Sequence, residues 1–206
     1  GGTSLDAGTT VAGNNAAFGT GTLTLNGGTL QGNGVAKTLA NTISLAASST
    51  VSGASDLTFN GLVTNTFAGN PTLTINNSGL TSFGSINLSN SATSRTLTLA
   101  GTGNTTINGV IANGSTSTAG AVVNSNSGTL TLNGANTYGG GTSLDAGTTV
   151  AGNNAAFGTG TLTLNGGTLQ GNGVAKTLAN TISLAASSTV SGASALTFNG
   201  LVTNTF

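Results

Sequence analysis

The sequence predicts an all-β protein, a right-handed parallel β-helix (β-solenoid) of about nine coils with no significant helix. Apolar residues alternate with Thr or Ser in short segments along the whole chain, and Gly and Asn separate these segments. In addition, residues 1–67 return almost unchanged as residues 140–206. A sandwich or barrel closes on itself, whereas a solenoid can continue into a second copy without interruption, so the repeat decides between them.

The internal repeat relates each residue n of the first copy to residue n + 139 of the second. Among the 67 positions compared only one differs, where Asp56 is replaced by Ala195. We expect residues 1–206 to form a single continuous solenoid, with 68–139 as the remainder of the repeat. Coils of about 20–25 residues place about six coils in each repeat. At about 4.8 Å per coil, one repeat would advance about 29 Å.

Period-2 alternation marks the expected strands. Each segment places Leu, Ile, Val or Phe on one face and Thr or Ser on the other, as in half-buried strands. The clearest of them are 21–30, 56–63, 71–80, 95–101 and 128–136. In a stacked coil the inward residues form apolar columns, and the ones expected here are Leu25, Leu45, Leu73, Leu99 and Leu132.

The outward and corner residues also suit stacking. Outward Thr residues are compatible with in-register neighbours, whereas stacked charges would repel one another. At the corners, as in residues 12–15 and 26–28, we expect Gly and Asn to adopt positive φ and the Asn side chains to form ladders between coils. No stretch has the periodicity of an amphipathic helix.

The small number of charges excludes some classes of protein. The chain has three basic residues, Lys37, Arg95 and Lys176, three acidic ones and no His, for a net charge of zero. A nucleic-acid partner is not expected, because such a protein needs many cations to neutralise phosphates. Membrane insertion of this segment is not expected either, because the longest apolar runs are far shorter than the roughly 20 residues of a membrane helix.

The acidic residues predict neither catalysis nor metal binding. Glycoside hydrolysis, a common activity of parallel β-helices, needs two carboxylates about 5–10 Å apart. Asp6 and Asp56 should lie about two coils apart, and Asp56 becomes Ala195 in the second copy. One Asp per repeat does not match a calcium-binding β-roll, so Asp6 and Asp145 are interpreted as solvated turn residues. We therefore predict a protein that is not an enzyme, with no catalytic, cofactor-binding or metal-binding residues.

Three other features have a structural and a functional interpretation. Outward Thr-x-Thr pairs could order water or bind ice, although Thr is also the outward residue best suited to stacking. Asn76, Asn87, Asn104 and Asn113 begin glycosylation sequons, which a chain so rich in Asn, Ser and Thr also generates by chance. Tyr138 is the only Tyr, and we expect it to pack at a corner rather than contact a ligand.

Residues Gly134 to Gln170, GANTYGGGTSLDAGTTVAGNNAAFGTGTLTLNGGTLQ, resemble the passenger-associated transport repeat of bacterial autotransporters. A shorter match covers Gly1 to Gln31, and Phe18 stands where the family usually has Leu. The resemblance implies a β-helical passenger that is exported through the outer membrane and acts as an adhesin, a surface stalk or a cell-contact protein. The absence of Cys agrees with export of an unfolded chain.

These observations together predict a structural, non-catalytic segment of a long extracellular fibre, stalk or adhesin at a bacterial cell surface. The chain begins at Gly1 within a motif and ends at Phe206 within a copy, so we expect a part of a longer repetitive protein or units that join end to end. The expected partners are copies of the chain itself and a cell or host surface. A Thr-rich β-helix that orders ice or water and a β-helix that binds or processes polysaccharide are the alternatives.

Overall fold

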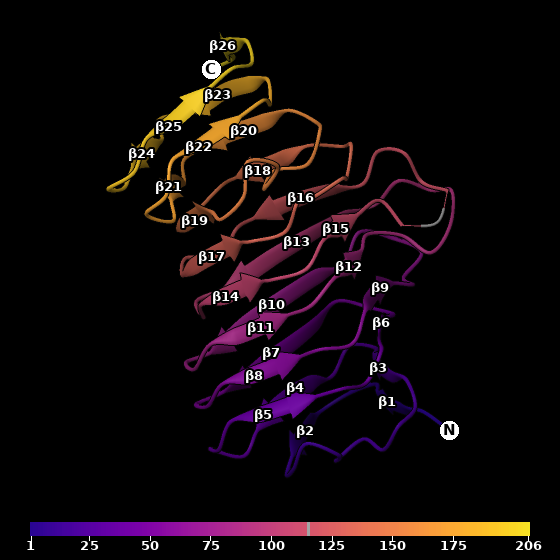
Figure 1. Cartoon of the computed structure of the whole chain (residues 1–206). Helices are drawn as coiled ribbons and strands as arrows, with labels where there is room; N and C mark the ends of the chain where they lie inside the picture. Colours follow the sequence, from indigo (N-terminus) through magenta and orange to yellow (C-terminus); the bar gives the residue numbers. More distant parts are fainter. Residues whose placement is uncertain (115) are drawn as a thin grey trace.

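The computed structural model describes residues 1–114 and 116–206, and its secondary structure over these residues consists of β-strands alone. The strands pair in parallel with strands of the neighbouring coils, so the chain winds into a β-solenoid of about ten turns. The two termini lie at opposite ends of the stack (Figure 1). The predicted fold class is therefore confirmed.

The coils have three faces. Face 1 begins as a six-stranded sheet of β1 (Thr3–Leu5), β3 (Leu23–Leu25), β6 (Ile43–Leu45), β9 (Val63–Asn65), β12 (Ile86–Asn87) and β15 (Ile111–Ala112). The strands β22 (Lys176–Leu178) and β25 (Leu196–Phe198) form a separate two-stranded sheet. Along the chain each of them comes after a face 3 strand and before a face 2 strand, so this sheet continues face 1.

Face 2 is the longest sheet and has ten strands. They are β2 (Thr9–Ala12), β4 (Thr29–Gly32), β7 (Ser49–Gly53), β10 (Thr72–Asn77), β13 (Thr96–Gly101), β16 (Ala121–Asn124), β18 (Thr142–Leu144), β20 (Leu162–Asn165), β23 (Ile182–Ala186) and β26 (Val202–Asn204). Face 3 has eight strands: β5 (Lys37–Leu39), β8 (Leu57–Phe59), β11 (Thr81–Phe83), β14 (Thr105–Ile107), β17 (Thr129–Leu132), β19 (Thr148–Ala151), β21 (Thr168–Gly171) and β24 (Thr189–Ser191).

The core consists of apolar columns that run from coil to coil. The expected inward residues are all buried, and they lie on three faces: Leu25 and Leu45 pair on face 1, Leu73 and Leu99 on face 2, and Leu132 lies on face 3. On face 3, Phe59 and Phe83 stack with ring centroids 4.9 Å apart and an angle of 8° between the planes. The inward side chains of all three faces belong to one core, and each coil covers the next.

The two copies of the repeat lie on different faces, which the sequence analysis did not predict. β1 is on face 1, whereas its counterpart β18 is on face 2, six strands after β2 in that sheet. One repeat therefore spans six full turns and one additional face. The remaining strands shift in the same way, so β2 on face 2 corresponds to β19 on face 3.

Only Gly adopts positive φ among the described residues, which corrects the expectation that corner Asn residues would do so. The short polar side chains instead accept hydrogen bonds from the backbone of the next coil. Asn15, Asp56 and Asn104 accept in this way from the N–H groups of Thr38, Leu80 and Thr129. The expected Asn ladder is present where the Asn133 Nδ2 donates to the Asn108 Oδ1 at 2.9 Å. Corner Asn thus links coils, and some corner Asn side chains also close local turns, as where the Asn14 Oδ1 accepts from the Ala16 N–H at 2.8 Å.

Candidate functional site

The segment 13–20, between β2 and β3, replaces a face 3 strand with hydrogen-bonded turns, in which Ala17 and Gly19 donate to the carbonyls of Asn14 and Ala16. Beside it is a hollow of about 260 Å³ lined by Asn15, Ala16, Gly19, Thr20, Ala40 and Asn41. Asn41 is buried, and its Nδ2 donates to the carbonyl oxygens of Gly19 (3.0 Å) and Gly21 (2.7 Å). The turn segment is thereby fixed to the next coil.

The same hollow occurs again in the second copy. Its lining residues are the counterparts of the first six, namely Asn154, Ala155, Gly158, Thr159, Ala179 and Asn180, and its volume is about 250 Å³. The Asn180 Nδ2 repeats the bonds of Asn41, to Gly158 (3.1 Å) and Gly160 (2.7 Å). The first hollow lies where face 3 lacks a strand, and the second where face 1 lacks one, so identical hollows open in two directions.

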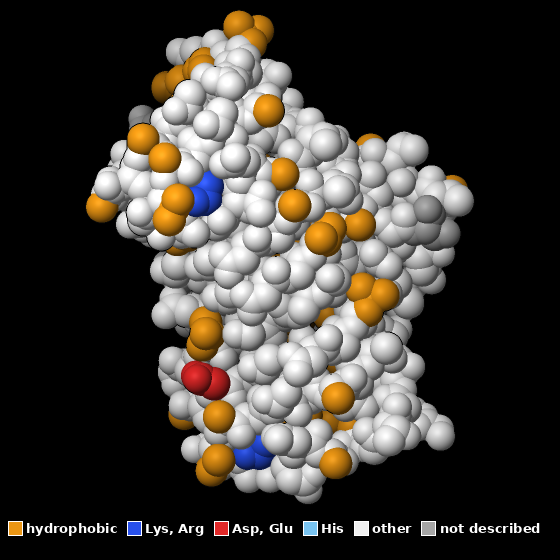
Figure 2. Space-filling model, in the orientation of Figure 1, with side chains coloured by type: hydrophobic (Ala, Val, Ile, Leu, Met, Phe, Trp, Pro, Cys, Tyr) orange, Lys and Arg blue, Asp and Glu red, His pale blue; other side chains and the backbone are white. Residues whose placement is uncertain are grey.

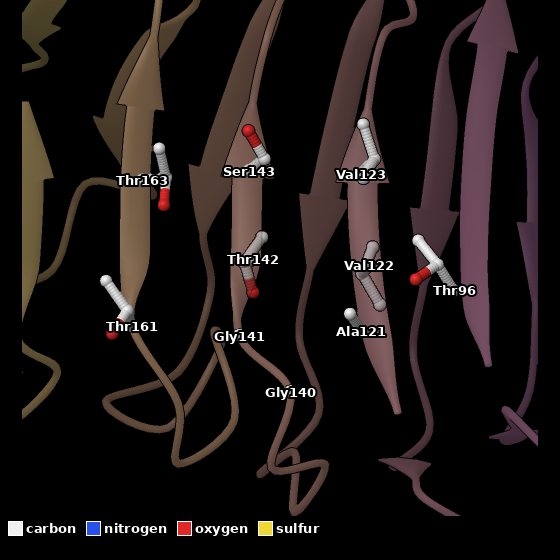
Figure 3. Close-up of a pocket in the computed structure, with 10 residues that line it drawn as sticks. All are labelled: Thr96, Ala121, Val122, Val123, Gly140, Gly141, Thr142, Ser143, Thr161 and Thr163. Atoms are coloured by element: carbon white, nitrogen blue, oxygen red, sulfur yellow. The ribbon is translucent and has the colours of Figure 1, made fainter. Parts of the chain in front are cut away.

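A third hollow, of about 160 Å³, lies on face 2 across β13, β16, β18 and β20. Figure 3 shows the side chains of Val123, Ser143 and Thr163 side by side on successive strands. Gly140 and Gly141 also line this hollow. Gly141 has a φ of +91°, and a Cβ there would lie 2.6 Å from the Thr161 carbonyl oxygen. Close contact between coils thus explains this glycine without a ligand.

The GANTY segment joins coils where face 1 lacks a strand between β17 and β18. The Asn136 Oδ1 accepts from the Ile111 N–H at 2.7 Å, and its Nδ2 donates to the Ala156 carbonyl at 2.6 Å. Tyr138 is fully buried, and its hydroxyl bonds with the Thr142 Oγ1 at 2.5 Å. Burial raises the pKa of Tyr138 well above its usual range. The expectation that Tyr138 packs within the protein is confirmed.

The carboxylates lie apart from one another, at separate corners. Asp6 follows a face 1 strand of the first coil, whereas Asp56 precedes a face 3 strand two coils later. Asp6 is exposed, and hydrogen bonds from the Ser4 Oγ (2.6 Å) and the Asn26 Nδ2 (2.9 Å) hold its pKa below the usual range. Asp145 makes the equivalent bonds with Ser143 and Asn165. Both residues act as turn residues, as predicted.

The three cations are buried, a feature that was not predicted from the sequence. Lys37, Arg95 and Lys176 are only 6–7 % exposed. Their acceptors are neutral oxygens: the Lys37 Nζ donates to the Val35 carbonyl at 2.7 Å, and one Arg95 nitrogen donates to the Asn65 carbonyl (3.1 Å) and the Asn90 Oδ1 (2.8 Å). The alternation of the sequence indicates this burial for the two lysines. Lys37 and Lys176 lie two residues before the inward residues Leu39 and Leu178, and therefore on the same side of the strand.

The remaining predicted features are distributed over the surface. Thr72 and Thr98 are neighbours in an outward column of face 2, which continues with Val123 and Ser143, so Thr does not fill it. Among the sequons, Asn76 and Asn104 are exposed, whereas the Asn113 Nδ2 donates to the Thr118 carbonyl at 3.2 Å. Figure 2 shows scattered apolar groups and few charges on one side of the molecule.

No protein-family model, curated protein or solved structure matches this chain. Within the described residues there is no group of three or more His, Cys, Asp or Glu side chains placed to hold a metal ion. The described residues also include no helix that is long and apolar enough to cross a membrane. The surface of the described chain can form hydrogen bonds through amides, hydroxyls and backbone groups, with few charges.

Proposed function

We propose that this chain is a structural, non-catalytic segment of a long extracellular fibre or stalk, which provides mechanical extension, adhesion or cell-cell cohesion. The observation that carries the proposal is the continuity of the solenoid between the two copies. Residues 140–206 add strands to the face 2 and face 3 sheets that residues 1–67 begin, and the ten strands of face 2 run without a break from β2 to β26. Repetition of such a unit lengthens a rod.

The shift of one face per repeat supports a role in contacts around the rod. Because identical hollows lie on face 3 in one copy and on face 1 in the next, a rod of many copies would offer the same surface in three directions. An adhesive filament or a cohesive bundle benefits from this arrangement, since neighbours can approach from any side. The proposed partners are therefore other copies of the rod and a cell or host surface.

The distribution of charge supports lateral association. The net charge is zero, and all three cations are buried, which leaves three carboxylates at the corners as the charges nearest to solvent. Electrostatic repulsion between such rods is small, and proteins of near-zero net charge associate more readily. The proposed export as an autotransporter passenger, and hence the location at a bacterial surface, rests on the resemblance of residues 134–170.

Electron microscopy of the native full-length protein, on cells and shed from them, tests the proposal. We expect long thin fibres with a strong axial repeat of about 4.8 Å and a weaker repeat of about 30 Å. The weaker repeat follows from the six turns and one face that each repeat spans. Compact discrete particles without an axial repeat would contradict the proposal. Binding of the native fibres to cells, compared with that of a shortened protein with fewer repeats, separates adhesion from extension alone.

A further inference from the structure

Lys176 has an unusual environment, because most of its side chain is buried and its ammonium group has no anionic acceptor among its hydrogen bonds. Lys176 is the first residue of β22 and is 7 % exposed. Its Nζ donates to the Asn172 Oδ1 at 2.7 Å and to the Val174 carbonyl at 3.0 Å, both neutral oxygens. A buried cation without an opposite charge is costly, so a carboxylate in place of the Asn172 amide would be favoured here.

The residue that follows Asn172 favours conversion of the Asn172 amide to a carboxylate. Asn172 is exposed and is followed by Gly173, which has a φ of +89° and no atom within 4 Å of the place where a Cβ would be. Within the described part of the chain, no hydrogen bond from the Gly173 N–H is found. Because glycine has no side chain, its backbone nitrogen can approach the preceding carboxamide closely. The hydrogen bond from Lys176 polarises the same carboxamide.

We propose that Asn172 is a site of spontaneous deamidation, and that the resulting carboxylate pairs with buried Lys176. The Gly173 nitrogen attacks the Asn172 Cγ and forms a C–N bond, while the Cγ–Nδ2 bond breaks and ammonia leaves with the proton of the Gly173 N–H. Water then hydrolyses one carbonyl of the cyclic imide. The product is aspartate or its β-linked isomer, and each conversion lowers the net charge of the chain by one unit.

The same segment occurs in the first copy as residues 32–37. Asn33 is exposed, Gly34 has the same φ of +89° with open surroundings, and Lys37 is 6 % exposed with its Nζ on the Val35 carbonyl at 2.7 Å. Asn33 is therefore a second candidate for the same modification. Only Asn172 has its Oδ1 hydrogen-bonded to the lysine, so Asn172 is the faster of the two.

Asn165 is a matched control within the same chain. It also precedes a glycine, but the Gly166 N–H donates to the Ser188 Oγ at 2.8 Å. This bond keeps the Gly166 nitrogen from attacking the Asn165 side chain. The Asn165 Nδ2 donates to the Asp145 Oδ1 at 2.9 Å, so a carboxylate at this position would face another carboxylate. Asn26 repeats both contacts in the first copy, with Ser49 and Asp6. The hydroxyl of Ser188 or Ser49 thus engages the attacking nitrogen at Asn165 and Asn26, whereas such a bond to the following glycine is not found at Asn172 and Asn33 in the described chain.

The test is incubation of the purified folded chain at mildly alkaline pH, followed by peptide mapping with mass spectrometry at each Asn-Gly pair. We expect Asn172, and then Asn33, to convert at least about tenfold faster than Asn165 and Asn26, a factor that corresponds to about 1.4 kcal/mol. In the denatured chain these four of the nine Asn-Gly pairs should convert at similar rates, because the backbone of each pair is then equally accessible. Equal rates in the folded chain, or faster conversion of Asn165, would overturn the proposal.

Two variants test the role of the lysine. Lys176→Met keeps a stem that fits the core and removes the charge, so conversion of Asn172 should slow while conversion of Asn33 stays unchanged. Asn172→Asp represents the product and should raise the melting temperature, whereas Asn165→Asp should lower it. A melting temperature that falls as much for Asn172→Asp as for Asn165→Asp would contradict the pairing with Lys176. The comparison of folded and denatured wild-type chain remains decisive if a variant does not fold.

Discussion

Leu5 and Leu144 occupy the same position in the two copies of the repeat, yet Leu5 pairs with Leu25 on face 1 and Leu144 pairs with Leu164 on face 2. Both side chains are buried, with 4 % and 0 % exposed. One sequence therefore fits two faces of the solenoid. This is physically reasonable because each face has the same alternation of inward apolar and outward polar residues, and the corners link coils through similar hydrogen bonds.

This relationship predicts the symmetry of a longer array. If further copies follow in tandem, each should be related to the last by a rise of about 30 Å and a rotation of about one third of a turn. Three copies would then restore the original face after about 90 Å. Helical reconstruction of the fibres by electron cryomicroscopy measures both values. Copies that stack without this rotation would show that the repeat spans a whole number of turns.

Asn136 should be important for stability, because it takes the place of strand pairing where face 1 has none. Asn136→Ala removes the partners of the Ile111 N–H and the Ala156 carbonyl. Two backbone groups left unsatisfied should lower the free energy of unfolding by about 2–4 kcal/mol, as measured by denaturant titration. The matched control is Asn133→Ala, which should cost less than about 1 kcal/mol, because the exposed side chain of Asn133 bonds to the Asn108 side chain and the substitution keeps the backbone bonds of residue 133. Similar losses in both variants would refute this role.

The single difference between the copies, Asp56 in the first and Ala195 in the second, should have little effect on stability. The Asp56 Oδ1 accepts from the Leu80 N–H at 2.8 Å, but the residue is exposed, so water can replace it in Asp56→Ala. The free energy of unfolding should fall by no more than about 1 kcal/mol in chemical denaturation. Asp56→Asn keeps the oxygen that accepts from the Leu80 N–H, so its free energy of unfolding should equal that of the parent chain. A loss above about 2 kcal/mol for Asp56→Ala would show that Asp56 has a structural role beyond this one bond.

Phe83 should be the most sensitive position of the face 3 column, because it stacks on Phe59 at 4.9 Å and pairs with Ile107 in the next coil. Phe83→Ala leaves a cavity and should cost about 3–5 kcal/mol. Phe83→Leu should cost less than about 2 kcal/mol, because the same column accepts aliphatic residues at Leu39 and Ile107. Thermal and denaturant unfolding of the two variants measure the difference. Equal losses would indicate that the column does not depend on side-chain volume.

The sequence predicted the coil and its inward residues because alternation reports directly which side chains point inward. It did not predict the shift of one face per repeat. The number of turns in a repeat follows from its length only if every turn has the same known length. The turns differ in length, because Leu25 pairs with Leu45 in the next coil, whereas Leu73 pairs with Leu99, which is further along the chain. Turns are therefore longer in the middle of the chain, where the loops between strands are longer.

The candidate site was harder to predict than the fold. The hollow beside Asn41 forms because the turn segment and the next coil meet there, and no local pattern gives that contact. The burial of Lys37 was predictable from its place in the alternation. It was not predicted, because a charged side chain is usually exposed to solvent. Corner Asn was expected at positive φ from its turn propensity. Among the described residues only Gly adopts positive φ, whereas the expected contact between Asn side chains of neighbouring coils is present at Asn108 and Asn133.

Tyr138 should make the protein sensitive to alkali. Burial raises the pKa of its hydroxyl in the folded chain, while the unfolded chain ionises near pH 10. Below pH 10 both states keep the proton and the contribution of Tyr138 to stability is complete. Above pH 10 only the unfolded state releases the proton, so stability falls by up to about 1.4 kcal/mol per pH unit until the folded-state pKa is reached.

The absorbance of phenolate measures this directly, because Tyr138 is the only Tyr in the chain. Ionisation should appear only together with loss of β-structure in circular dichroism. Tyr138→Phe loses the hydrogen bond to Thr142, which should cost about 1 kcal/mol at neutral pH, but its stability should decline less steeply above pH 10. Phenolate that forms near pH 10 in the folded chain would show that Tyr138 is accessible to solvent and that the coil opens at this position.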